Sequence, residues 1–113
     1  MHELGIAQQM LKIALDHAGA NKTEQITAFN IEMSDMADEN PESLTLCLEN
    51  LARNTIAQDA RVNIARVPAR MSCLDCGNEY DSATSPGACP HCHSTLIRPL
   101  EGDEFRLISI DVA

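Results

Sequence analysis

The sequence predicts an α+β fold, with two helices packed on a small three-stranded sheet and a cysteine-rich module inserted before the last strand. Two observations support this prediction. Helical and strand periodicities follow one another in the order helix, strand, helix, strand, strand. Two Cys-x-x-Cys pairs lie between the last two strand patterns. We therefore expect one domain formed by residues 1–69 and 98–113, and a second, inserted domain formed by residues 70–97.

The first third of the chain shows a helical pattern and then a strand pattern. Apolar residues recur at intervals of three and four from Leu4 to Ala18, which predicts an amphipathic helix. Gly19 is expected to cap this helix in a left-handed conformation. From Gln25 to Met33 the apolar side chains alternate between two faces, which predicts a strand.

A second helix and two further strands follow. Asn40 before Pro41 is typical of a helix start, because Asn caps the first turn and Pro fits the first helical position. Alternating apolar residues from 62 to 67 predict a strand that stops at Pro68. Residues 105–112 are rich in β-formers and predict a third, well-buried strand.

The composition excludes some classes of function. The net charge of −9, with eight scattered Lys and Arg residues, argues against nucleic-acid binding, which needs clustered positive charge. An acidic surface instead suits a basic protein partner or a cation. The chain has neither the roughly 18 apolar residues of a membrane span nor the basic, apolar start of a secretory signal. We expect a cytoplasmic protein that does not associate with membranes.

Four of the five cysteines form two pairs that are typical of a metal site. Cys73 and Cys76 form the first pair, Cys89 and Cys92 form the second, and Cys47 stands apart. Two residues between thiolates let both sulfurs face one ion, and two such turns complete the closed tetrahedral geometry of structural Zn²⁺. The segment is also shorter than the roughly 40 residues below which a domain usually needs a disulfide, a metal ion or oligomerisation to fold. We predict a structural four-cysteine zinc site in a zinc-ribbon or rubredoxin-knuckle module.

Other residues of the module have simpler expected roles. Gly77 stands where the first turn needs a positive φ, and Tyr80 and Leu96 are candidates for packing. Two alternatives to zinc fit the cysteine pattern less well. A rubredoxin-like iron site would be surrounded by more aromatic residues than Tyr80 alone, and a redox dithiol needs one Cys-x-x-Cys at a helix start rather than two facing pairs.

His91 and His93 flank the last cysteine. We expect both to be exposed polar residues of a loop. The sharper alternative is that one of them displaces a thiolate or responds to pH, since imidazole titrates near neutrality.

The N-terminus, Met1-His2-Glu3, can form a second metal site. A bulky His2 is expected to prevent removal of Met1, which leaves the α-amine next to it. This amine, the His2 amide nitrogen and the His2 imidazole can surround a square-planar ion such as Ni(II) or Cu(II). Glu3, or a group from a partner, could fill the fourth position. Taken alone, a histidine at this position is usually only an exposed terminal residue.

The two ends of the chain together resemble one family. The resemblance rests on Met1-His2-Glu3-Leu4 opening a helix, a Pro-started second helix, the two Cys-x-x-Cys pairs with His93-Ser94, and Gly102-Asp103-Glu104 before a strand that contains Ser109-Ile110. This combination is similar to the HypA/HybF family of nickel metallochaperones for [NiFe]-hydrogenase maturation. The likeness extends over essentially the whole chain.

The resemblance implies a transferable Ni²⁺ at His2, with Met1 and Glu3 beside it, and a structural Zn²⁺ at the four cysteines. It also implies the GTPase HypB and the hydrogenase large-subunit precursor as partners, and some family members also serve urease. A homodimer is compatible with the sequence. His93 departs from the Gly that many relatives have after the last cysteine. No catalytic constellation is evident, so we expect no enzyme activity.

Two rival functions need no nickel. One is a zinc-ribbon adaptor that binds a protein, or a nucleic acid, and the other is a rubredoxin-like electron carrier with iron at the four cysteines. Nickel titration distinguishes the first from a metallochaperone. Colour distinguishes the second, because a ferric four-thiolate site is red and a zinc site is colourless.

Overall fold

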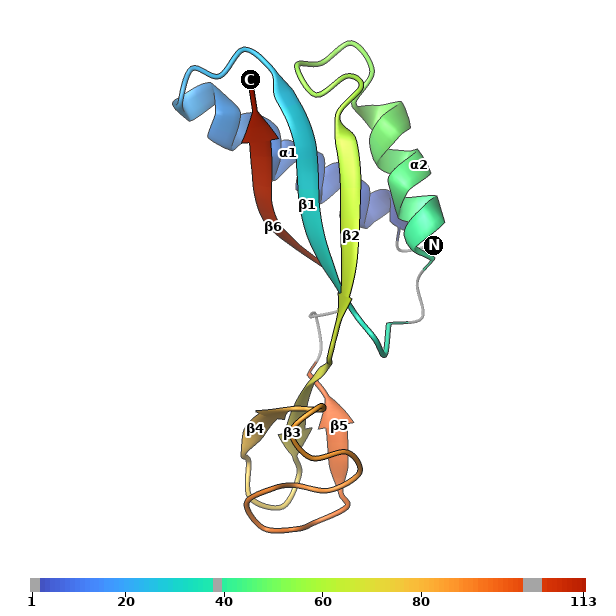
Figure 1. Cartoon of the computed structure of the whole chain (residues 1–113), viewed down its shortest axis with the longest axis vertical. Helices are drawn as coiled ribbons and strands as arrows, with labels where there is room; N and C mark the ends of the chain where they lie inside the picture. Colours follow the sequence, from blue (N-terminus) through green and yellow to red (C-terminus); the bar gives the residue numbers. More distant parts are fainter. Residues whose placement is uncertain (1–2, 38–39, 101–104) are drawn as a thin grey trace. The chain divides into compact units, whose positions relative to one another are not determined.

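The chain divides into two compact units in a computed structural model that describes residues 3–37, 40–100 and 105–113 (Figure 1). The first unit comprises Met1–Glu32, Asp38–Ala65 and Arg106–Ala113. The second unit comprises Met33–Ala37 and Arg66–Phe105. The second unit therefore contains all of residues 70–97 and extends beyond them on both sides.

The larger α/β part of the chain has two helices and a three-stranded sheet. The helices are α1 (Glu3–Ala20) and α2 (Pro41–Leu51). The strands are β1 (Ile26–Ser34), β2 (Arg61–Val67) and β6 (Phe105–Val112), and their order in the sheet is β2-β1-β6. The predicted fold class and the predicted order of these elements are confirmed.

Apolar side chains from both helices and the central strand form the core of this part, which is aliphatic apart from Phe29. The helices contact each other, and α2 lines a hollow together with Phe29 of β1 and Val62 of β2. Phe29, Leu44 and Leu48 are almost completely buried. Within the described residues, neither helix has the length and apolar character needed to cross a bilayer.

Asn40 begins α2 as predicted. Its side-chain Oδ1 accepts a hydrogen bond of 2.8 Å from the amide of Glu42, and Pro41 follows in the first helical turn. The cap satisfies an amide that has no partner inside the helix.

The end of α1 differs from the prediction, because Gly19 lies inside the helix. The left-handed residue is Lys22, with φ 56°. The Thr23 amide bonds to the Ala18 carbonyl at 2.9 Å, and the Lys22 amide bonds to the Gly19 carbonyl at 3.2 Å. This pair of bonds is the Schellman motif. The helix therefore extends past Gly19 to Ala20, and Lys22 adopts the left-handed conformation that was expected of Gly19.

The burial of β6 was also predicted wrongly. Its bounds agree with the prediction, but only Phe105 is buried, while Ile108 and Val112 are each 49% exposed. The physical reason is its position at the edge of the sheet, where a strand has one neighbour instead of two. A run of β-formers does not distinguish an edge strand from a central one.

The second unit contains a small sheet that the sequence patterns did not predict. Its strands are β3 (Arg70–Cys73), β4 (Glu79–Asp81) and β5 (Ile97–Pro99), in the order β4-β3-β5. Both pairings are antiparallel, with Met71 opposite Tyr80 and Pro99. Strands of three or four residues are too short to show a clear alternation.

Candidate metal centre

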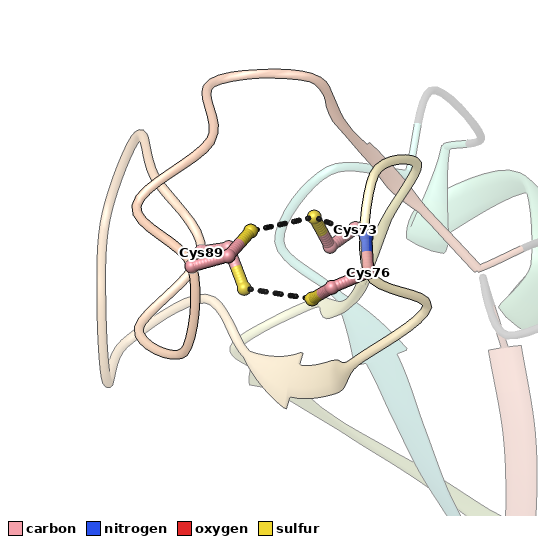
Figure 2. A group of neighbouring side chains, drawn as sticks. Cys73, Cys76 and Cys89 are labelled. Carbon is pink, nitrogen blue, oxygen red and sulfur yellow. Dashed lines mark hydrogen bonds between the residues drawn. The ribbon is translucent and has the colours of Figure 1, made fainter.

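The four paired cysteines of the second unit come together in space. Their four Sγ atoms all lie within 4.8 Å of one another. Cys73 Sγ lies 3.5 Å from Cys92 Sγ, and Cys76 Sγ lies 3.6 Å from Cys89 Sγ. Figure 2 shows Cys73 and Cys76, which belong to one turn, facing Cys89 in the other. We call these four residues the cysteine cluster.

The cluster has the size that a tetrahedral zinc ion requires. Zinc–sulfur bonds of about 2.3 Å place neighbouring sulfurs about 3.8 Å apart, and the Cys73–Cys92 and Cys76–Cys89 sulfur separations of 3.5 and 3.6 Å are near this value. Four sulfurs also form the closed ligand set of structural zinc sites. The donor set and its spacing therefore fit a structural Zn²⁺.

Two turns of the same conformation hold the sulfurs, and we call them the first knuckle (73–78) and the second knuckle (89–94). In the first, the Cys73 amide bonds to the Asn78 carbonyl at 2.9 Å and the Gly77 amide bonds to the Cys73 carbonyl at 3.0 Å. In the second, the equivalent bonds are Cys89 to Ser94 at 2.8 Å and His93 to Cys89 at 2.9 Å. The backbone thus presents the two pairs of sulfurs in the same way.

Each knuckle has a left-handed residue directly after its second cysteine. Gly77 has a φ of 77°, as predicted, and His93 has a φ of 64°. A glycine adopts this conformation without strain, whereas a residue with a Cβ pays about 1–2 kcal/mol. The second knuckle is therefore strained at His93 in a way that the first is not.

Exchanging these residue types should change the two knuckles in opposite directions. Gly77→Ala should lower the stability of the zinc-loaded protein by about 1 kcal/mol, and this penalty comes from the backbone, because an added Cβ meets no atom within 4 Å. His93→Gly should raise stability by about 0.5 kcal/mol, since relief of strain exceeds the entropy cost of glycine. Thermal unfolding of both variants measures the effects. A stabilising Gly77→Ala would contradict this account.

Hydrogen bonds from backbone amides prepare part of the cluster to bind a cation. Burial opposes ionisation of Cys89, but bonds from the Cys92 and His91 amides and from neighbouring thiols outweigh it and lower its pKa to about 6. The pKa of Cys73 is also lowered, chiefly by the Cys76 amide. A thiolate is the form that binds metal, so these two sulfurs are the readier ligands.

The other two cysteines ionise with more difficulty. The Ser94 amide favours the Cys92 thiolate, but burial and hydrogen bonds with the other three cysteines prevail and raise its pKa to about 12. The pKa of Cys76 is raised as well, since burial and two of its cysteine neighbours outweigh the Asn78 amide. Four thiols this close together do not all ionise in the absence of a bound cation. A divalent cation removes the conflict by replacing their protons.

The core under the cluster is very small. Its buried members are Ala69, Met71, Cys73, Tyr80 and Cys89. Tyr80 is buried as predicted, but Leu96 is 56% exposed and the prediction that it packs is wrong. Its neighbour Ile97, the first residue of β5, packs on the core instead, because adjacent side chains of an extended chain point to opposite faces.

The remaining histidines and cysteines of the described chain lie outside the cluster. His91 and His93 are exposed, as expected for loop residues. Their exchange with a thiolate stays a hypothesis. Cys47 is half-buried on α2 and belongs to the first unit.

The predicted nickel residues Met1 and His2 lie outside the described residues. Glu3 is half-buried and is the first residue of α1. The structure therefore shows where the helix next to the predicted site begins, and the site itself remains a prediction.

Comparisons with known proteins identify the family. A family model described as "Hydrogenase/urease nickel incorporation, metallochaperone, hypA" matches residues 1–112. The chain belongs to the HypA family. It is 32% identical to the hydrogenase maturation factor HypA of Azotobacter chroococcum mcd 1, over 99% of each chain. It is also 32% identical to the hydrogenase maturation factor HybF of Klebsiella pneumoniae, over 98% of each.

Solved structures of HypA proteins share the fold. The solution structure of the Ni metallochaperone HypA from Helicobacter pylori has a TM-score of 0.82 at 22% identity, and covers 99% of this chain and 97% of that one. A second solution structure of a HypA protein has a TM-score of 0.78 at 22% identity. These similarities support the arrangement of helices, sheet and cysteine module described above.

Proposed function

We propose that this chain is a nickel metallochaperone that binds Ni(II) at its N-terminus and delivers it during [NiFe]-hydrogenase maturation. The observation that carries the proposal is membership of the HypA family over residues 1–112, a match that includes Met1-His2-Glu3. Nickel is the cargo, whereas zinc at the cysteine cluster is a resident structural ion. The proposed zinc ligands are Cys73, Cys76, Cys89 and Cys92.

The chemistry of the N-terminus suits a cargo site. The α-amine of Met1, the His2 amide nitrogen and the His2 imidazole offer three nitrogen ligands for a square-planar ion. Glu3 or a partner can complete the set. A chain terminus also permits transfer by stepwise ligand exchange, because each ligand can be replaced without opening a folded core.

The partners follow from the same proposal. We infer that the GTPase HypB and the hydrogenase large-subunit precursor receive or exchange the nickel, and that this takes place in the cytoplasm. The acidic net charge of −9 suits a partner with a basic surface.

Nickel titration of an untagged protein that begins at Met1 tests the proposal. Calorimetry should show one Ni(II) per chain with a micromolar or tighter dissociation constant. A matched protein with two extra residues before Met1 loses the amine ligand and should bind nickel at least roughly tenfold more weakly. If the untagged protein takes up no nickel at micromolar concentrations, the delivery function fails and a zinc-ribbon adaptor remains.

A further inference from the structure

Side chains join the two knuckles in addition to the four sulfurs. The side-chain amide of Asn78, in the first knuckle, donates to Cys89 Sγ in the second at 3.9 Å. In the opposite direction, Ser94 Oγ of the second knuckle donates to the Asp75 carboxylate of the first. Each knuckle therefore sends one side chain across to the other.

The two crossing residues occupy equivalent places. The backbone carbonyl of Asn78 accepts a hydrogen bond from the Cys73 amide, and the backbone carbonyl of Ser94 accepts one from the Cys89 amide. Both side chains are half-buried. Their backbones close the turns, so their side chains are held where they can reach the neighbouring knuckle. Cys-x-x-Cys spacing alone gives no indication of this cross-bracing.

The crossing bonds make the cluster asymmetric. The two buried sulfurs, of Cys73 and Cys89, receive the same backbone hydrogen bonds. In each case the donors are the amides of the second and third residues after the cysteine. Among the described residues, the Asn78 bond adds a side-chain donor at Cys89 Sγ. Cys89 is also completely buried. A hydrogen bond to a charged acceptor is stronger than one between neutral groups, so this contact gains strength when the sulfur is a metal-bound thiolate.

We propose that Asn78 is a positioning residue of the zinc centre, whose side-chain amide, together with the Asp75–Ser94 bond, holds the two pairs of sulfurs together and slows release of the ion. The inference rests on the proposed zinc site. Separation of the two pairs, which belong to different segments of the chain, opens the site and favours release of zinc. A bond from one knuckle to a sulfur of the other opposes that separation. It acts like an outer contact that orients a metal ligand.

Two variants at position 78 measure the effect, with zinc transfer to a coloured chelator as the assay. Asn78→Ala should speed transfer at least roughly tenfold, the lower end of what losing one hydrogen bond to a charged group costs. Asn78→Asp should speed it further, since a carboxylate would then face a thiolate. Neither change touches the backbone bonds that close the knuckle.

The absorption spectrum of the cobalt-substituted protein gives a second measurement, which a general loss of stability would not change. Loss of the donor raises the energy of the sulfur lone pair, so the sulfur-to-cobalt absorption band of Asn78→Ala should shift to longer wavelength. Ser94→Ala breaks the crossing bond that does not touch sulfur. It should speed metal transfer and leave the band in place.

Asn63→Ala is the matched control. It removes a hydrogen bond of 3.0 Å from the Asn63 side-chain amide to Asn30 Oδ1, and both residues belong to the first unit, away from the cysteine cluster. It should transfer zinc at the wild-type rate. A wild-type rate in Asn78→Ala, or a faster rate without the band shift, would overturn the role of Asn78. Failure of the wild-type protein to bind zinc or cobalt would instead overturn the zinc site itself.

Discussion

Stripping zinc from the protein is expected to unfold the second compact unit and to leave the first one folded. Among the described residues, the core under the cysteine cluster has only five buried members, and two of these are proposed zinc ligands. The three strands around it are only three or four residues long. Zinc contributes about 10–16 kcal/mol of apparent folding free energy in such small domains, which exceeds what this core can supply. The first unit has its own core around Phe29, Leu44 and Leu48.

Amide hydrogen exchange before and after treatment with a chelator measures this directly. Protection should be lost in β3, β4 and β5 and kept in α1, α2 and β1. Cys89→Ser should produce the same pattern without a chelator. Cys47→Ser is the matched control, since Cys47 lies outside the cluster, and it should keep one zinc per chain. Full protection of β3 in zinc-free protein would contradict the prediction.

The features that were predicted correctly have local causes. Asn40-Pro41 begins a helix because the cap and the fixed φ act within one turn. Gly77 takes a positive φ because the knuckle around two closely spaced thiolates requires it. In each case the residues that decide the outcome are adjacent in the sequence, so the pattern is visible without the fold.

The features that were missed depend on distant parts of the chain. β6 has the composition of a buried strand, and its exposure follows from which strands pair beside it. Leu96 and Ile97 are both apolar, and only the pairing of β5 with β3 decides that Ile97 faces the core. The contact of Asn78 with Cys89 joins two separate knuckles. Spacing within either knuckle cannot show it.

His2→Ala is expected to abolish tight nickel binding and leave the zinc content and the fold unchanged. The imidazole is the one side-chain nitrogen in Met1-His2-Glu3, so without it only the amine and backbone amides remain. Affinity should fall by at least about a hundredfold, because losing a direct ligand costs at least as much as losing an outer-shell partner. Calorimetry with Ni(II) measures the loss.

His17→Ala is the control that separates this site from general histidine binding. His17 is exposed in the last turn of α1, so the variant removes the same chemical group at a distance from the N-terminus. It should bind nickel like the wild type. Zinc content and hydrogen exchange in β3 should be normal in both variants, since the cysteine cluster uses no histidine. Nickel affinity at the wild-type level in His2→Ala would refute the proposed site, and equal losses in both variants would indicate that nickel binds surface histidines generally.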